Sequence, residues 1–140
     1  MMVKKFVFLA FILCCSVFAQ DNPSTQDNST QDKSSTIQAL EAKKQNNEWR
    51  KIKGSFPNQN EFFNIAEQGF RTYYRKYSPQ VVSRSDENLI MAANYGKHHV
   101  KCIFFIDASS QYIVILETDF DRDRIKWINN VVKQVETLGK

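Results

Sequence analysis

The chain has 140 residues, of which 42% are hydrophobic and 24% are charged, and this indicates one small globular domain with a modest core. Its formal net charge is +4, but residues 1–19 hold two lysines and no acid, so the remainder carries only +2. A charge this small supports solubility and excludes a strongly basic protein, so we expect no nucleic-acid partner.

Residues 1–19 have the three-part layout of a secretory signal peptide. Lys4 and Lys5 precede an apolar run over residues 6–18, and the run ends in Val17-Phe18-Ala19. The run is shorter than the about 20 residues that span a bilayer. We therefore expect export to the periplasm or the medium, with cleavage after Ala19.

Lipoprotein processing is the alternative for the same segment, because Cys14 and Cys15 lie within it. An acylated Cys14 or Cys15 would give a lipid-anchored protein, and only then do we expect a membrane association. Neither cysteine has both a leucine three residues earlier and a small residue just before it. After cleavage only Cys102 remains, and we interpret it as a buried small hydrophobe.

Residues 20–35 form a spacer rich in Ser, Thr, Gln and Asp. The pentad at residues 24–28 is repeated with one change at residues 29–33, and no large hydrophobic side chain occurs in this stretch. Such a segment cannot bury enough apolar surface to offset the entropy of ordering it. We therefore predict a disordered spacer, followed by a single domain over residues 36–140.

Two helices are predicted at the start of that domain. The first runs from Thr36 to about Lys53 and has a thin apolar stripe in which Trp49 and Ile52 do most of the packing. The second runs from Gln59 to Tyr77, and Gly69 within it marks a position where we expect another backbone to come close. Its wide aromatic face repeats at three- and four-residue steps and consists of Phe62, Phe63, Ala66, Phe70, Tyr73, Tyr74 and Tyr77.

Strands follow the helices. Gln80–Arg84 is a candidate edge strand, and alternating patterns predict three further strands over Asn88–Tyr95, His98–Asp107 and Gln111–Asp119. Their short connections imply antiparallel hairpins.

A last helix is predicted from Asp121 to Leu138. Its expected buried stripe consists of Ile125, Ile128, Val132 and Val135, with Trp127 and Val131 at the margin. The expected fold class is therefore α+β: an antiparallel meander of three to four strands packed by two N-terminal helices and one C-terminal helix, in the order α-α-β-β-β-α.

The second face of this sheet is unexpectedly apolar. A face that met water would be polar, yet alternation places five large hydrophobic residues on it, namely Ile90, Ile103, Phe105, Ile113 and Ile115. We expect the first helix to cover them through Trp49 and Ile52. A second subunit in a homodimer, or a small apolar ligand, would cover them equally well, so these five residues are the candidate ligand or interface face.

Motifs for catalysis or cofactor binding are weak. Asp119–Asp123 has the D-x-D-x-D opening of a calcium loop, but Arg124 and Asn130 stand where that loop needs Gly and Glu. We interpret Asp119 or Asp121 as the cap of the last helix. His98 and His99 are neighbours on a strand and point to opposite faces. We predict no catalytic residue, metal site or cofactor.

Basic residues interleave with tyrosines along the second helix. This pattern is compatible with an anionic binding surface, but we prefer an aromatic core with a solvated basic edge. The residues concerned are Arg71, Tyr73, Tyr74, Arg75, Lys76, Tyr77 and Arg84.

The leading hypothesis for function is a small exported, non-catalytic binding or interaction module with an unidentified protein partner. The alternative is a carrier of a small lipophilic ligand in a pocket between sheet and helices. An enzyme with residues scattered along the sequence comes third.

Overall fold

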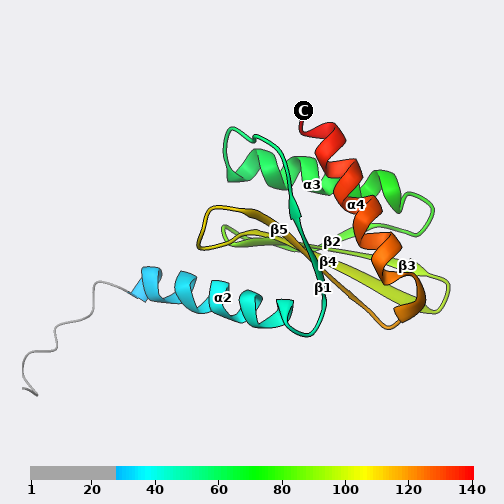
Figure 1. The fold of residues 1–140 in the computed structure, drawn as a ribbon, viewed down its shortest axis with the longest axis horizontal. Coiled ribbons are helices and arrows are strands. Elements are labelled where there is room, and N and C mark those ends of the chain that lie inside the picture. The colour runs from blue at the N-terminus through cyan, green and yellow to red at the C-terminus, as the bar shows by residue number, and fades with distance from the viewer. Residues whose placement is uncertain (1–27) are drawn as a thin grey trace, which may run out of the picture. The chain divides into compact units, whose positions relative to one another are not determined.

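An antiparallel sheet of five strands, with helices on both faces, makes up the α+β fold seen in the computed structural model (Figure 1). The structure describes residues 28–140, and side chains from residue 35 onward. The predicted signal peptide, Cys14, Cys15 and residues 20–27 of the predicted spacer lie outside the described residues. The elements are α2 (Asn28–Lys44), β1 (Glu48–Ile52), α3 (Gln59–Tyr73), β2 (Gln80–Arg84), β3 (Asn88–Tyr95), β4 (His98–Ile106), β5 (Tyr112–Thr118), the 3-10 turn η1 (Asp121–Asp123) and α4 (Arg124–Leu138).

The strands lie in the order β1-β5-β4-β3-β2, and every neighbouring pair is antiparallel. Strands β3, β4 and β5 form the predicted meander, and β2 is the predicted edge strand. The reversal between β3 and β4 contains Gly96, whose φ of 63° lies in the left-handed region that glycine adopts without strain. Residues 34–140 form one compact unit, and α2 begins within the segment predicted as a spacer.

The prediction of one helix from Thr36 to Lys53 is wrong in its second half. Helix α2 ends at Lys44, and β1 then pairs with β5 as the fifth strand. In the observed register Trp49 is opposite Ile115, whereas Ile52 points to the other face and is 1% exposed. Backbone pairing with an existing strand and burial of Ile52 outweigh the helical preference of this short, charged segment.

Helix α3 begins at a capped position and ends earlier than predicted. The side chain of Asn58 accepts a hydrogen bond from the backbone N–H of Glu61 at 2.9 Å, and the helix stops at Tyr73. Gly69 packs against α4, since a Cβ atom there would lie 2.7 Å from a methyl group and 3.1 Å from the backbone nitrogen of Val135. The predicted close approach at Gly69 is confirmed.

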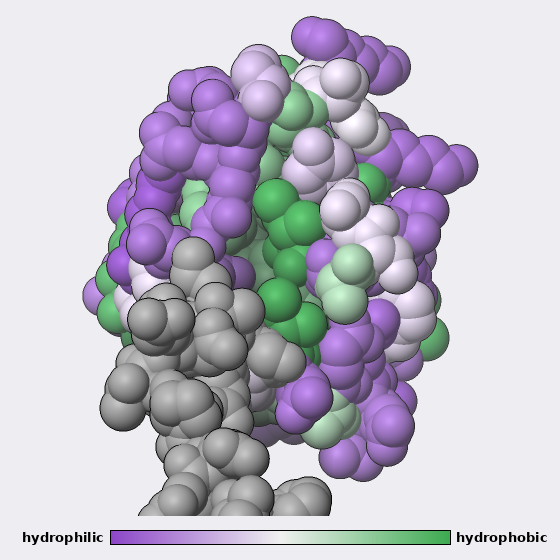
Figure 2. Space-filling model, turned by 90° about the vertical axis from the view of Figure 1, so that its left-hand side faces the viewer, coloured by the Kyte–Doolittle hydropathy of each residue, from purple (hydrophilic) through white to green (hydrophobic). Residues whose placement is uncertain are grey.

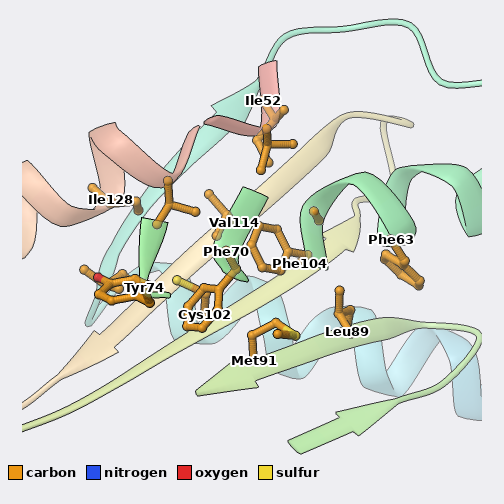
Figure 3. Packing of buried hydrophobic residues seen from close by; sticks show 14 of the residues in the cluster. Ile52, Phe63, Phe70, Tyr74, Leu89, Met91, Cys102, Phe104, Val114 and Ile128 are labelled. Carbon is orange, nitrogen blue, oxygen red and sulfur yellow. The ribbon is translucent and has the colours of Figure 1, made fainter. Parts of the chain in front are cut away.

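The main core lies between the sheet and helices α3 and α4. Figure 3 shows side chains of both helices directed toward those of the strands. Helix α4 is turned about its axis relative to the prediction, because its largest apolar side chain, Trp127, packs inward at 5.4 Å from the ring of Tyr95. Ile125 is consequently 54% exposed, which corrects its assignment to the buried stripe. The buried residues of α4 are Trp127, Ile128, Val131 and Val135.

Candidate functional site

The predicted ligand or interface face is buried beneath α2. Its residues form a second, smaller cluster made of Leu40, Ile103, Phe105, Ile113 and Ile115, with the half-buried Ile90 packed at its side. The four strand residues of β4 and β5 are at most 1% exposed. The prediction that Trp49 and Ile52 provide the cover is wrong, because both lie on β1 and the covering side chain is Leu40.

Charged contacts join Leu40 in holding the described part of α2 against the sheet. Lys43 Nζ lies 2.8 Å from one carboxylate oxygen of Glu117, and Lys101 Nζ lies 3.1 Å from the other. Burial raises the pKa of Glu117, but the bonds from Lys43 and Lys101 outweigh burial and hold that pKa below its ordinary value. Lys44 Nζ lies 4.1 Å from the ring centre of Trp49.

Figure 2 shows one face of the molecule, on which a strip of strongly hydrophobic residues runs between hydrophilic ones.

A pocket lies at a different place, where the end of α3, the end of β3 and the start of α4 meet. Its volume is about 530 Å³, within the range of small-molecule sites. We call it the aromatic pocket, because five of its lining residues are Tyr73, Tyr74, Tyr77, Tyr95 and Trp127.

The rings of the aromatic pocket contact one another at tilted angles. Ring centres are 4.8 Å apart for Tyr77 and Tyr95, and 5.4 Å apart for Tyr95 and Trp127. Tyr73 and Tyr74 meet edge to face at 4.7 Å. Mutual packing of this kind fixes the rings in place, so the pocket wall is preorganised.

Two hydroxyl groups of this wall differ in their hydrogen bonding. The Tyr73 hydroxyl accepts a bond from Asn130 Nδ2 at 3.3 Å. The Tyr74 hydroxyl is buried and has no hydrogen-bond partner among residues 28–140. Burial raises the pKa of Tyr74 far above its ordinary value, so this hydroxyl stays protonated and remains a donor without an acceptor.

The rim of the aromatic pocket carries more positive than negative charge. Arg75, Lys76 and Lys126 line it together with one carboxylate, Asp123. The three cations are exposed, whereas Asp123 lies 3.4 Å from the guanidinium of Arg122.

The two histidines make local contacts on different sides of β4. His98 Nδ1 lies 3.4 Å from Asp119, and its ring stacks on Phe120 at 4.3 Å. His99 Nδ1 lies 2.9 Å from the side-chain oxygen of Asn94. The backbone N–H of His99 donates to Asp119, and this bond lowers the pKa of that carboxyl. Across residues 28–140, no three His, Cys, Asp or Glu side chains come together as a metal site.

Neither Asp119 nor Asp121 caps the last helix, so that prediction is wrong. Helix α4 follows the turn η1, and its N-cap residue is Asp123, whose side chain makes no capping bond. Asp119 instead accepts a hydrogen bond from the backbone N–H of His99.

Cys102 is fully buried, and burial raises the pKa of its thiol, as fits the predicted small hydrophobe.

Only some of the residues of the aromatic pocket could be predicted from the sequence. The sequence pattern contains the tyrosines and basic residues near the end of α3, but Trp127 and Lys126 belong to α4 and Tyr95 to β3. Their approach depends on the tertiary fold. Not all basic residues of the interleaved pattern line the pocket: Arg71 and Arg84 instead donate hydrogen bonds to oxygens elsewhere in the chain.

Comparisons with protein-family models, with curated proteins and with solved structures find no match to this chain. Over residues 28–140, no helix has the length and apolar character needed to cross a membrane. Function is therefore inferred from the residues themselves.

Proposed function

We propose that this protein is an exported, non-catalytic binding module that holds a ring-bearing ligand in the aromatic pocket. One observation carries the proposal: aromatic side chains from α3, β3 and α4 converge on a single cavity of about 530 Å³. Stacked or edge-to-face ring pairs contribute about 0.5–1.5 kcal/mol each beyond the area they bury. A ligand ring that contacts two of these side chains therefore gains affinity and orientation together.

The exposure of the pocket residues supports the same proposal. Tyr95 is 37% exposed and Tyr77 is half-buried, although both rings are large. Trp127, in contrast, is 5% exposed and anchors the wall. Aromatic rings that are held rigidly but left partly open are typical of small-molecule sites.

The two tryptophans of the chain make a direct test simple. In the Trp49→Phe variant, all tryptophan emission comes from Trp127 in the pocket. Titration with phenylacetamide or phenylacetate should change this emission to a plateau, because the added ring packs within the pocket. The matched control is Trp127→Phe, in which Trp49 reports from β1 and its emission should not change. No saturable change in Trp127 emission with either compound would contradict the proposal.

A second candidate is the carrier of a small lipophilic ligand, with the ligand held beneath α2. The observation that favours it is an apolar cluster of β4 and β5 to which the described part of α2, residues 35–44, contributes one buried side chain, Leu40. Trp49 lies on this face opposite Ile115 and reports on it. Titration of the Trp127→Phe variant with 1-decanol distinguishes the candidates: a carrier should show a saturable change at Trp49, and a pocket-binding module should not.

A further inference from the structure

We propose that the ligand of the aromatic pocket is a small anion that carries a carboxylate or phosphate group beside its ring. This inference rests on the proposed function and adds the charge of the ligand to it. It is based on the absence of ion pairs at the pocket cations among residues 28–140, on the position of these cations at helix ends, and on the volume of the pocket.

The cations of the pocket are uncommitted. Arg75, Lys76 and Lys126 form no ion pair with any residue in the part of the chain that the structure describes. Other basic side chains of the protein are engaged, for example Lys43 and Lys101 with the carboxylate of Glu117. Three cations around one concave, partly apolar site produce a positive potential there, which favours an anionic ligand.

The position of Lys126 is not explained by helix stability. Arg75 and Lys76 follow the C-terminus of α3, where a cation interacts favourably with the helix dipole. Lys126 lies in the first turn of α4, where a cation is unfavourable, and the acidic residue nearest to it in sequence is Asp123 at the N-cap, which also lines the pocket. An anion bound in the pocket would meet both Lys126 and the positive end of α4.

The size of the pocket indicates a small molecule and not a polymer. A volume of about 530 Å³ accommodates one ring with its substituents. The aromatic wall and the cations line the same cavity, so one compact molecule can contact both.

The test uses the full mature chain with Trp49→Phe and compares ligands of matched shape. Phenylacetate and phenylacetamide differ in charge and hardly in size, phenyl phosphate adds a second charge, and inorganic phosphate has no ring. We expect phenylacetate to bind about two- to fivefold more tightly than phenylacetamide for each cation it engages, and phenyl phosphate to bind more tightly still. Raising the salt concentration should reduce the difference, because the cations are exposed.

Lysine variants test whether the pocket cations cause the preference for phenylacetate over phenylacetamide. Lys76→Gln combined with Lys126→Gln should remove most of the preference for phenylacetate over phenylacetamide and leave binding of the amide unchanged. Lys133→Gln is the matched control, because Lys133 is exposed on the same helix but does not line the pocket. It should leave the preference intact.

The outcomes separate the two proposals. Equal affinities for phenylacetate and phenylacetamide would overturn the inferred charge and leave the ring-binding function standing. Binding of inorganic phosphate as tight as that of phenyl phosphate would also overturn it, since the site would then recognise an ion alone. A Trp127 signal that responds to none of the ring compounds would overturn the proposed function itself.

Discussion

Neighbouring residues of β4 serve two separate cores. Phe104 and Phe105 are both fully buried, yet Phe104 belongs to the cluster beneath α3 and α4, and Phe105 to the cluster beneath α2. Strand alternation alone sends them to opposite faces. Each face therefore has to exclude water for the strand to be stable.

The substitution Phe105→Asp tests this at a single position. It places a carboxylate among Ile103, Ile113 and Ile115 without a basic partner, and should lower the free energy of unfolding by about 3–5 kcal/mol in a urea titration. Ala108→Asp, in the exposed turn after β4, is the control and should change stability little. A Phe105→Asp protein of unchanged stability that only loses a dimer or a ligand would show that this face is an interface or a pocket.

At the scale of elements, an ion pair to the sheet helps to position α2. This helix buries Leu40 and is tied to β5 through Lys43 and Glu117. The folded-state pKa of Glu117 is lowered from its ordinary value of 4.5. The stabilisation is therefore fully present above about pH 4.5 and is lost as the pH falls through the folded-state pKa.

The substitution Glu117→Gln should reveal this dependence. Because the ion pairs are partly exposed, we expect a loss of up to about 1 kcal/mol in unfolding free energy at pH 7. The difference between the original protein and the variant should shrink as the pH falls through the folded-state pKa of Glu117 and disappear below it, where the carboxyl is protonated in both states. Urea titrations across the pH range measure it, and Glu67→Gln on α3 is the control. A difference that persists at the lowest pH would rule out a role for the ionised carboxylate.

Some elements could be predicted from local sequence pattern, whereas others depend on tertiary contacts. Strand β3 has alternating burial, β4 is rich in apolar residues on both faces, and a glycine turn joins them, so the boundaries of this hairpin follow from local pattern. Strand β1 has five residues with mixed charge and becomes a strand only by pairing with β5. The aromatic pocket likewise needs three elements that meet through packing. Periodicity therefore predicts the faces of this molecule, and the tertiary fold decides their partners.

For the whole molecule, export is the prediction with the widest consequences. Residues 1–19 combine a cationic start, an apolar run and a small residue at position 19. The compact unit begins at Ser34, so removal of these residues leaves its described elements β1 to α4 complete. Cys102, the one cysteine after Ala19, is buried, so oxidation in an exported compartment has no accessible thiol to attack in the folded unit.

Expression of the full chain in a bacterial host tests this. The protein recovered from the periplasm or the medium should begin at Gln20, as shown by N-terminal sequencing and intact mass. Phe11→Arg places a charge in the apolar run and should block export, so that the chain keeps its first 19 residues. Replacing both Cys14 and Cys15 with Ser should leave cleavage unchanged. If that double variant is not processed, or if the original protein carries a diacylglyceryl group on either cysteine, the protein is a lipoprotein held at the membrane by its acyl chains.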